Sequence, residues 1–565
     1  DAPFLCVERV TAASYGIEAR EISWRDASHA VAALRERYAA AGYGHGHRVG
    51  LMLENRPAFL FHWFALNALG ASVVPINAEM RSAELEYLVG HSGIVLAVVL
   101  PGRGTDLEAA AKACSVPLAV LEWREKDDEA AASAASAPTA STSSSAPSAP
   151  SAAPARPAPS QATSPALSRA LAPAPRADAP IGGDTECALL YTSGTTGRPK
   201  GCMLSNAYYL NVGRWYAALG DVCTVRPDVE RIITPLPLNH VNAMAFSLMV
   251  VLVAGGCLVQ LDRFHPQTWW QSVRESGATI IHYLGVMPAM LLVAAPSPDD
   301  RAHAVRWGFG AGVDGRNHAP FEARFGFPLA EAWAMTETGA GAAVIATREP
   351  RLVGTHCFGR PDPFMQVRIV DDEGRDVAPG TQGEMLVRAS GPDPRRHLFS
   401  GYLKDADATA AAWEGGWFHT GDTVRGDADG SLFFVDRKKN VIRRSGENIS
   451  AAEVESVLNQ HPSVKAAAVA ATPDALRGDE VLACIVTREP LPEGARAQLA
   501  ASIVDHALGQ LAYFKAPGYV AFVDALPLTL SQKIQRGELR KLAQTMPQQP
   551  HCIDTRAMKK RQATA

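Results

Sequence analysis

The sequence predicts an α/β protein with a large N-terminal domain of mainly parallel sheets, a β-rich subdomain and a small α+β domain at the C-terminus. Its 565 residues are too many for one ordinary core, so two or more domains are expected. Strand-like and helical runs alternate along most of the chain, which is typical of a parallel sheet covered by helices. Near the C-terminus this alternation gives way to a different order of helices and strands, which indicates a second domain.

The region before residue 131 carries the clearest alternation. Short apolar runs rich in Val and Leu are separated by longer runs in which apolar residues recur at helical spacing. Strands connected by helices in this way pair in parallel and are buried. We expect strands at 48–53, 71–75 and 95–100, and helices at 58–69 and 82–92.

Residues 131–180 consist almost entirely of Ala, Pro, Ser and Thr and contain no aromatic residue. Such a segment cannot bury enough apolar surface to offset the entropy lost on ordering. An Ala-rich helix is the alternative, but the prolines spread through the segment disfavour it. Because apolar, patterned sequence resumes on both sides, we interpret residues 131–180 as a disordered surface insertion.

After the insertion the pattern of strands and helices continues. A strand at 187–191 is followed by a glycine-rich loop and a helix at 207–218. The apolar stretch 241–261 has the length of a membrane span, but Asn242 and a Gly-Gly pair interrupt it. We therefore expect a buried helix, a Gly-Gly turn and a buried strand at 257–261.

Short strands separated by Asp-Gly and Pro-Gly turns at 366–387 and 432–435 predict the β-rich subdomain. The charged run 436–440 has no apolar period and lies between two domain patterns, so a hinge and a solvated face are equally plausible there. We place the large domain at 1–438, the small domain at 439–546 and a flexible tail at 547–565, with helices at 451–458 and 495–508 and strands at 466–470 and 481–486 in the small domain.

Composition narrows the functional classes. A formal net charge of -4 gives no electrostatic argument for binding nucleic acid, and 47% hydrophobic residues fit a soluble globular protein without a membrane span. Nine cysteines are scattered without a C-x-x-C pair, which favours reduced thiols in a cytoplasmic protein over disulfides or a zinc site. No signal peptide opens the chain, and since it begins at Asp1 without a methionine, we expect a trimmed N-terminus. Oligomeric state has no signature in this sequence.

The most informative run is 191–201, a loop of glycine, hydroxyl and cation. Its glycines let backbone N–H groups approach phosphate oxygens, its hydroxyls donate hydrogen bonds, and Lys200 supplies a positive charge. A Walker A loop needs Ser or Thr after the lysine, whereas here Gly201 follows Lys200 and Pro199 precedes it. A solvated Gly/Ser turn is the alternative reading. The residues expected to bind phosphate are Thr192, Ser193, Gly194, Thr195, Thr196, Gly197 and Lys200.

This run resembles the signature loop of the adenylate-forming superfamily, which includes acyl-CoA synthetases, luciferases and the adenylation domains of peptide synthetases. Further motifs follow in the order of that superfamily and cover most of the chain. The segment 264–296, the Phe-Val-Asp-Arg block at 434–437 and the Gly-Glu-Asn run at 446–448 are most similar to the crotonobetaine/carnitine-CoA ligase branch. The resemblance implies a small, mobile C-terminal domain that rotates about Lys439 between two half-reactions.

The segment 331–339, Glu-Ala-Trp-Ala-Met-Thr-Glu-Thr-Gly, resembles the second nucleotide motif of the superfamily. The resemblance implies that Glu337 binds Mg²⁺, that Thr336 bonds the α-phosphate and that Trp333 packs on adenine. Magnesium takes one or two carboxylates together with phosphate oxygens, which suits a single glutamate. For this segment alone, a surface loop with an ordinary glutamate is the alternative. The other residues expected around the nucleotide are Ala334 and Met335, and, from the glycine-rich run 308–312, Gly310, Ala311 and Gly312.

Two more motifs complete the expected nucleotide site. Trp-Phe-His-Thr-Gly-Asp at 417–422 resembles the ribose motif, which implies that Asp422 accepts from the ribose hydroxyls and Arg437 contacts ribose or phosphate. Alone, Thr-Gly-Asp would indicate only a turn. Lys533 matches the lysine that neutralises charge at the α-phosphate during adenylation, although Gln532 stands where the superfamily usually has glycine. The catalytic residues implied by the resemblance are Lys533, Thr336, Glu337 and Lys200.

Two further segments are expected to meet the acyl group and coenzyme A. His240 matches a position that borders the acyl pocket in the superfamily, although a purely structural histidine is nearly as plausible. Gly446 would let the narrow thiol arm pass, and the arginines beside it would either meet CoA phosphates or be solvated. The whole run that resembles the pantetheine tunnel of CoA ligases is Arg443, Arg444, Ser445, Gly446 and Glu447.

The implied reaction is adenylation of a carboxylic acid by ATP with Mg²⁺, followed by transfer of the acyl group to coenzyme A with release of AMP and pyrophosphate. Two alternatives remain. One is an adenylation enzyme that loads a carrier-protein thiol. The other is a non-catalytic nucleotide-binding protein, which Gln532 and the long insertion would fit. The acid has no sequence signature, because its pocket is built from side chains that meet only in the fold.

Overall fold

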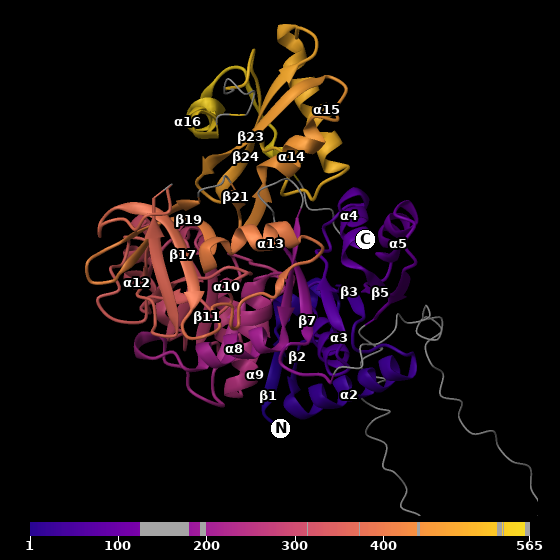
Figure 1. Ribbon diagram of the computed structural model, residues 1–565, viewed down its shortest axis with the longest axis vertical. Helices are drawn as coiled ribbons and strands as arrows, with labels where there is room; N and C mark the ends of the chain where they lie inside the picture. Colours follow the sequence, from indigo (N-terminus) through magenta and orange to yellow (C-terminus); the bar gives the residue numbers. More distant parts are fainter. Residues whose placement is uncertain are drawn as a thin grey trace, which may run out of the picture.

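The computed structural model describes residues 1–124, 180–192, 199–313, 315–371, 373–437, 441–527, 534 and 536–559. In Figure 1 a small C-terminal domain, which includes β23 (Val464–Asp474) and β24 (Gly478–Thr487), lies above a larger body. Most of the phosphate loop, Lys439, Lys533 and all but the last residue of the expected insertion lie outside the described residues.

The N-terminal alternation forms a seven-stranded sheet of order β18-β8-β7-β4-β3-β5-β6. β3 (Arg48–Met52) pairs in parallel with β4 and β5 on its two sides, and a helix connects each strand to the next. The strands and helices predicted between residues 48 and 100 are confirmed within two residues at each end. Among the other strands of the sheet are β4 (Ser72–Pro75), β5 (Ile94–Val99), β6 (Ala119–Glu122) and β18 (Gly401–Tyr402). The helices of this region are α2 (Trp24–Ala40), α3 (Pro57–Asn67), α4 (Ser82–Ser92) and α5 (Gly104–Ala113).

The phosphate loop joins two neighbouring strands of this sheet, β7 (Glu186–Thr192) and β8 (Lys200–Ser205). They pair antiparallel, with Thr192 opposite Lys200. The sequence predicted β7 and the helix that becomes α8 (Asn206–Ala217), but not β8. The six residues of β8 mix Lys, Gly and Ser with apolar residues and carry no clear period, so no local pattern identifies them as a strand.

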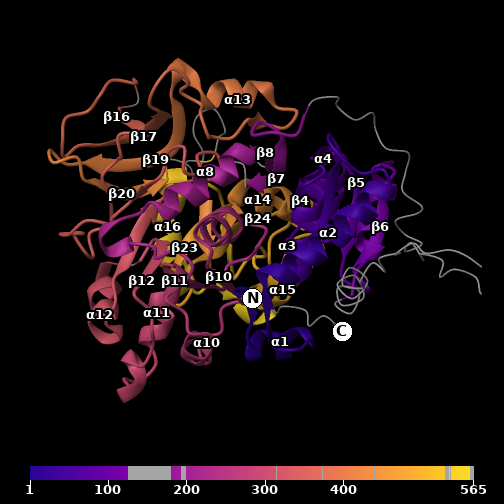
Figure 2. The same cartoon turned by 90° about the horizontal axis from the view of Figure 1, so that it is seen from below.

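The second large sheet has eight strands in the order β14-β13-β12-β11-β9-β10-β1-β2. In Figure 2 its strands β10, β11 and β12 lie to the left of β4, β5 and β6 of the first sheet. The six inner strands, from β13 to β1, are parallel, so their carboxyl ends meet at one edge. The strands are β1 (Pro3–Val7), β2 (Arg20–Ser23), β9 (Arg231–Thr234), β10 (Cys257–Gln260), β11 (Ile280–Leu284), β12 (Trp307–Ala311), β13 (Leu329–Trp333) and β14 (Val344–Ile345).

The apolar stretch 241–261 folds as the sequence predicts. A π-helix (Asn242–Ser247) continues into α9 (Leu248–Ala254), Gly255 adopts a left-handed conformation with φ of 80°, and β10 follows. No helix in the described part of the chain combines the length and apolar character needed to cross a bilayer. The remaining helices of the large domain are α1 (Arg9–Tyr15), α10 (Trp269–Glu275), α11 (Val286–Leu292), α12 (Gly315–Phe325) and α13 (Ala406–Ala412).

The predicted β-rich subdomain is a five-stranded sheet of order β15-β20-β19-β17-β16 in which neighbouring strands run antiparallel. Its β19 and β20 place Asp422 directly opposite Arg437, which explains how two residues of the expected ribose site come together. The strands are β15 (Cys357–Gly359), β16 (Met365–Val370), β17 (Gln382–Ala389), β19 (Phe418–Gly426) and β20 (Leu432–Arg437).

The small domain has its own sheet and its own hydrophobic core. Its buried apolar residues form clusters between Ile442 and Met558, whereas those of the large domain lie between Phe4 and Phe434. None of these clusters contains residues from both domains. Its other elements are β21 (Val441–Arg444), β22 (Glu447–Ser450), α14 (Ala451–Leu458), α15 (Arg496–Leu508), β25 (Tyr519–Phe522), α16 (Arg536–Thr545) and β26 (Cys552–Asp554).

The flexible tail predicted at 547–565 is wrong for much of its length. Within it β26 pairs antiparallel with β25, and the side chain of Lys559 is fully buried. Three residues of strand are too few to produce a visible period, and their pairing depends on the free edge of β25.

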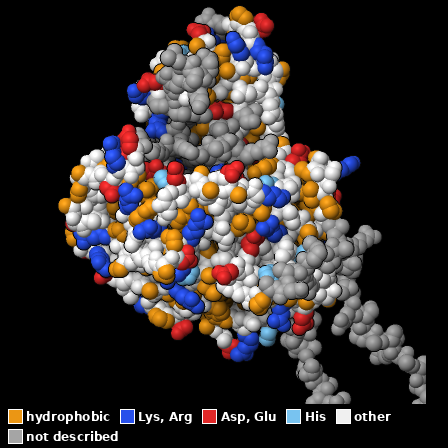
Figure 3. Space-filling view, viewed as in Figure 1, with side chains coloured by type: hydrophobic (Ala, Val, Ile, Leu, Met, Phe, Trp, Pro, Cys, Tyr) orange, Lys and Arg blue, Asp and Glu red, His pale blue; other side chains and the backbone are white. Residues whose placement is uncertain are grey.

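Charges are mixed on the face of the molecule shown in Figure 3. Lys and Arg side chains alternate there with Asp and Glu, and no single-sign patch covers the face. This distribution agrees with the near-neutral balance of -4.

Candidate functional site

A cavity of about 1570 Å³ opens between the large domain and the small domain. Its walls come from the carboxyl ends of β11, β12 and β13, from the β7–β8 hairpin and from the β21–β22 hairpin. Pockets for one small molecule usually measure about 300–1000 Å³, so this cavity has room for more than one. The predicted site residues that line it are Thr192, Lys200, His240, Gly310, Ala311, Gly312, Ala334, Met335, Thr336, Glu337, Arg443, Arg444, Ser445, Gly446 and Glu447.

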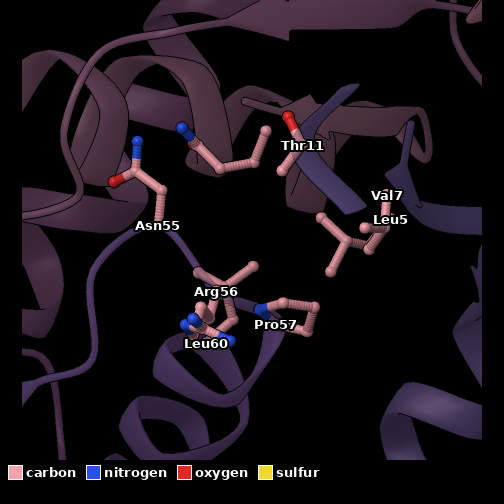
Figure 4. A pocket seen from close by; sticks show the side chains of 8 residues that line it. Leu5, Val7, Thr11, Asn55, Arg56, Pro57 and Leu60 are labelled. Carbon is pink, nitrogen blue, oxygen red and sulfur yellow. The ribbon is translucent and has the colours of Figure 1, made fainter. Parts of the chain in front are cut away.

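A second cavity, shown in Figure 4, lies between Leu5 and Val7 of β1 and Pro57 and Leu60 of α3. Its volume is about 10 Å³. This is close to the space of a single water molecule, which excludes it as a substrate site.

Glu337 lies four residues beyond the end of β13, in a tightly bonded position. Its carboxylate Oε1 accepts a hydrogen bond of 2.9 Å from the Tyr402 hydroxyl, and its carbonyl oxygen accepts one of 2.8 Å from the Phe399 N–H. Burial, and next the charge of Glu337, raise the pKa of Tyr402, so this hydroxyl stays protonated and donates at neutral pH. The carboxylate is therefore held at the cavity wall in one orientation.

Lys200, at the C-terminal end of the phosphate loop, lies close to Tyr402. Its Nζ lies 4.8 Å from the centre of the Tyr402 ring and 4.0 Å from Asp405 Oδ2. The Tyr208 hydroxyl holds the carbonyl oxygen of Thr336 at 2.9 Å. Sequence reasoning found Lys200, Thr336 and Glu337 but missed both tyrosines, because they come from β18 and α8, outside the recognised motifs.

The glycine-rich run at the end of β12 is shaped by close backbone contacts. A Cβ at Gly310 would lie 2.4 Å from the Tyr283 carbonyl oxygen, so only glycine fits there. Gly312 has a φ of 79°, and its N–H donates to Glu331 Oε2 at 2.9 Å. Burial raises the pKa of Glu331, to which the Tyr283 hydroxyl also donates. Glu331 thus fixes the loop, a role that the sequence did not suggest.

Trp333 and Asp422 are together, but they do not line the cavity. The Trp333 indole Nε1 donates to Asp422 Oδ2 at 2.9 Å, and the two residues are 6% and 1% exposed. Side chains alternate along β13, so Ala332 and Ala334 face the cavity while Trp333 points to the other side. Adenine packing by Trp333 and ribose binding by Asp422 stay predictions.

The β21–β22 hairpin of the small domain projects into the cavity. Gly446 at its tip has a φ of 88°, and a Cβ there would lie 2.1 Å from Leu284 Cδ1 at the end of β11. Glycine therefore permits the close approach of the two domains at this point. The segment expected to line a thiol tunnel does face the large domain.

His240 meets this hairpin directly, with its Nε2 3.1 Å from Glu447 Oε2. Burial acts to lower the pKa of His240, but the Glu447 carboxylate outweighs it and the pKa lies above its ordinary value. Burial likewise acts to raise the pKa of Glu447, and the charge of His240 outweighs it in the opposite direction. The pair is a charged contact between the two domains.

Arg443 and Arg444, both expected near CoA phosphates, differ in their surroundings. Arg443 is exposed. Arg444 is 5% exposed, and its Nε donates to Glu480 Oε2 at 2.8 Å. The buried Lys559 Nζ also contacts Glu480, and burial followed by the Arg444 charge lowers the pKa of Lys559 to about 7. Binding of a CoA phosphate by Arg444 stays a prediction, and the phosphate would compete with the Glu480 carboxylate for the guanidinium.

A second contact between the domains surrounds Lys515. Its Nζ lies 2.7 Å from Glu84 Oε1 on α4 and 2.9 Å from Glu453 Oε1 on α14. Because Glu84 lies 431 residues from Lys515 in sequence and Glu453 lies 62 residues from it, no local pattern identifies them.

Comparison with known proteins agrees with this geometry. The model of the AMP-binding enzyme family matches residues 8–403, and that of the AMP-binding enzyme C-terminal domain matches residues 453–533. The chain is 28% identical over 529 residues to a crotonobetaine/carnitine-CoA ligase of Salmonella paratyphi A, covering 92% of this chain and 93% of the relative. The corresponding ligase of Salmonella typhi is 29% identical over 507 residues, covering 88% and 89%.

Solved structures share the fold. An o-succinylbenzoate CoA synthetase from Bacillus subtilis superposes with a TM-score of 0.73 at 23% identity, covering 93% of this chain and 94% of the other. A malonyl-CoA ligase bound to methylmalonyl-CoA and AMP superposes with a TM-score of 0.68 at 25% identity, covering 93% and 97%. The large and small domains of this chain therefore follow a known two-domain architecture.

Proposed function

This chain belongs to the AMP-binding enzyme family, and from that premise we propose that it is an ATP-dependent acyl-CoA ligase. It activates a carboxylic acid as an acyl-adenylate and transfers the acyl group to coenzyme A, with release of AMP and pyrophosphate. The observation that carries the proposal is the shared cavity. Lys200 beside the phosphate loop, Glu337 and the β21–β22 hairpin all line it, although they come from separate parts of the chain.

In the first half-reaction a carboxylate oxygen attacks the α-phosphorus of ATP and pyrophosphate leaves. Negative charge then concentrates on the phosphate oxygens, so catalysis rests on positioning and on cations held ready for that charge. Lys200 and the loop hydroxyls are suited to the phosphates, and Lys533 is our candidate for the charge at the α-phosphate.

Glu337 is the candidate ligand of Mg²⁺. Within the described ranges no three His, Cys, Asp or Glu side chains gather in a way that could hold a metal ion. A single carboxylate at the wall of an ATP-sized cavity nevertheless fits magnesium, which takes much of its shell from phosphate and water. The ion would neutralise phosphate charge during adenylation.

In the second half-reaction the thiol of coenzyme A attacks the acyl carbonyl and AMP leaves. The hairpin position fits this step, because Gly446 lies against Leu284 and Glu447 meets His240 at the cavity. We propose that adenylation uses another domain arrangement, reached by rotation about Lys439, in which Lys533 approaches the nucleotide. His240 would then mark the boundary between the acyl pocket and the thiol path.

The proposal is tested by a screen of carboxylic acids with hydroxylamine, which traps acyl-adenylates as hydroxamates. The screen covers betaines, aryl acids and short-to-long fatty acids, and at least one acid should give acid-dependent pyrophosphate release. Consumption of free CoA then separates a CoA ligase from an enzyme that loads a carrier protein. No pyrophosphate release with any acid would instead favour a non-catalytic nucleotide-binding protein.

We also propose that the protein is located in the cytoplasm. All nine cysteines are free thiols, which fits a reducing compartment.

A further inference from the structure

Asn242 is an amide side chain in the cavity wall that has aromatic neighbours. It lies at the start of the π-helix, one turn before Phe246, which also lines the cavity. The Phe246 ring stacks on Phe309 of β12 with centroids 5.4 Å apart. π-Helical turns are uncommon and often occur at functional positions, so the placement of Asn242 calls for a physical explanation.

A buried network holds the Asn242 side chain from behind. His282 Nδ1 lies 2.8 Å from Asn242 Oδ1 and 2.8 Å from Ser247 Oγ. His282 Nε2 lies 3.0 Å from the Tyr216 hydroxyl. Both His282 and Tyr216 are completely buried, so every hydrogen of this network must find its acceptor inside the protein.

The Tyr216 hydroxyl determines which atoms of the network donate and which accept hydrogen bonds. It has no other hydrogen-bond partner among the described residues, so it would leave its proton unpaired unless it donates to His282 Nε2. Burial lowers the pKa of His282 to about 3, so the ring is neutral and carries one proton. That proton is therefore on Nδ1, and the Nδ1–H is shared by Asn242 Oδ1 and Ser247 Oγ, whose own hydroxyl donates to the Asn242 carbonyl oxygen at 3.4 Å.

The orientation of the Asn242 amide follows from this. Its oxygen is engaged by His282, and its two N–H donors remain. In the part of the chain that the structure describes, nothing accepts a hydrogen bond from Asn242 Nδ2. The donors belong to a residue at the cavity wall, next to aromatic rings that cannot satisfy them well.

We propose that Asn242 Nδ2 donates to an acceptor oxygen on the acyl part of the substrate. The substrate class is thus a carboxylic acid that carries an ether, carbonyl or hydroxyl oxygen along its chain, in preference to a plain hydrocarbon acid. This inference rests on the proposed acyl-CoA ligase function. A hydrocarbon acid would bury the amide without a partner, which disfavours it by about 10-fold or more.

An oxygen scan tests the inference. Hexanoate and octanoate are compared with their ether analogues, in which one methylene at a time is replaced by oxygen, an acceptor that cannot donate. The readouts are kcat/KM for acid-dependent pyrophosphate release and the dissociation constant from calorimetry. At one chain position the ether analogue should exceed its parent acid by about 10-fold in both readouts.

Two variants assign the preference to the amide. Asn242→Leu removes the donor and should bring the ether-to-parent ratio to one or below. Asn242→Asp keeps the shape but replaces the donor by an acceptor, and should also abolish the preference. Asn239→Leu removes an amide from another part of the same cavity and should leave the ratio unchanged.

The inference and the proposed function fail in different ways. If the hydrocarbon acids are activated and bound as well as every ether analogue, or if Asn242→Leu keeps the preference, the inference is overturned and the ligase activity stands. If no acid releases pyrophosphate, the proposed function fails. Calorimetry still decides the inference then, because a preference for one ether position that Asn242→Leu removes supports it, and its absence overturns it.

Discussion

The Tyr402 hydroxyl positions the Glu337 carboxylate, and Lys200 lies over the ring of the same tyrosine. Tyr402→Phe removes only the hydroxyl. Because hydrogen bonds to charged groups contribute about 1.5–3 kcal/mol, we expect pyrophosphate release to fall by about 10- to 100-fold, with a higher requirement for Mg²⁺. Steady-state kinetics at varied Mg²⁺ measure both effects.

Tyr38→Phe is the matched control for this prediction. Its buried hydroxyl bonds to His62 at 2.6 Å and belongs to no part of the cavity lining. It should lower stability and leave the Mg²⁺ requirement unchanged. Full activity of Tyr402→Phe at low Mg²⁺ would show that the tyrosine has no positioning role.

The contact between His240 and Glu447 predicts a pH window for thioester formation. The pKa of His240 is raised, so its contribution is complete below its unfolded pKa and is lost as pH rises through the folded value. The pKa of Glu447 is lowered, so its contribution is present above its unfolded pKa and is lost as pH falls through the folded value. Thioesterification of preformed acyl-adenylate should decline on the alkaline side as His240 loses its proton.

His240→Gln should remove this alkaline step, whereas His29→Gln, at an exposed histidine, should keep it. The pH profile of single-turnover thioester formation measures the difference. An identical alkaline step in His240→Gln would assign the titration to another group.

At the scale of elements, the β21–β22 hairpin is fixed to the C-terminal segment by the buried group Arg444, Glu480 and Lys559. Glu480→Gln leaves the buried Arg444 guanidinium without a counter-charge. Breaking a buried ion pair in this way usually costs about 3–5 kcal/mol, so we expect a loss of that size in the unfolding free energy of the small domain. All ten tryptophans lie between Trp24 and Trp417, so hydrogen exchange is the suitable measurement.

Glu538→Gln provides the comparison within the same domain. Its partner Lys541 is 74% exposed, and exposed pairs contribute at most about 1 kcal/mol. Equal losses in both variants would contradict a structural role for the buried group.

Elements with a strong local period could be predicted from the sequence. The strands and helices between residues 48 and 100 could be predicted, because each buries an apolar face with its own spacing. β8 and β26 could not be predicted, because β8 mixes polar and apolar residues without a clear period and the three-residue β26 depends on the free edge of β25. The motif residues of the site were found by resemblance, but Tyr402 and Lys559 lie outside the motifs and reach the site only through the fold. Glu331 belongs to a motif, and only the fold shows that it holds Gly312. The side chains alternate along β13, which places Trp333 on the face opposite Ala332 and Ala334.

At the scale of the whole molecule, Lys515 joins the domains by bridging Glu84 and Glu453. Lys515→Met leaves two carboxylates facing each other, so the arrangement with the hairpin in the cavity should be less populated. We expect slower thioesterification with little change in adenylation, measured as separate half-reactions. The exposed Lys541→Met should change neither, and an equal effect of Lys515→Met on both would argue against a domain-specific role.

The central claim is that one cavity serves two reactions in two arrangements of the same domains. The most direct test is Lys533→Ala, assayed separately for adenylation and for thioester formation from preformed acyl-adenylate. The account predicts that adenylation falls by on the order of 100- to 1000-fold while thioester formation stays close to that of the unchanged protein. Equal loss of both half-reactions, or normal adenylation, would contradict it.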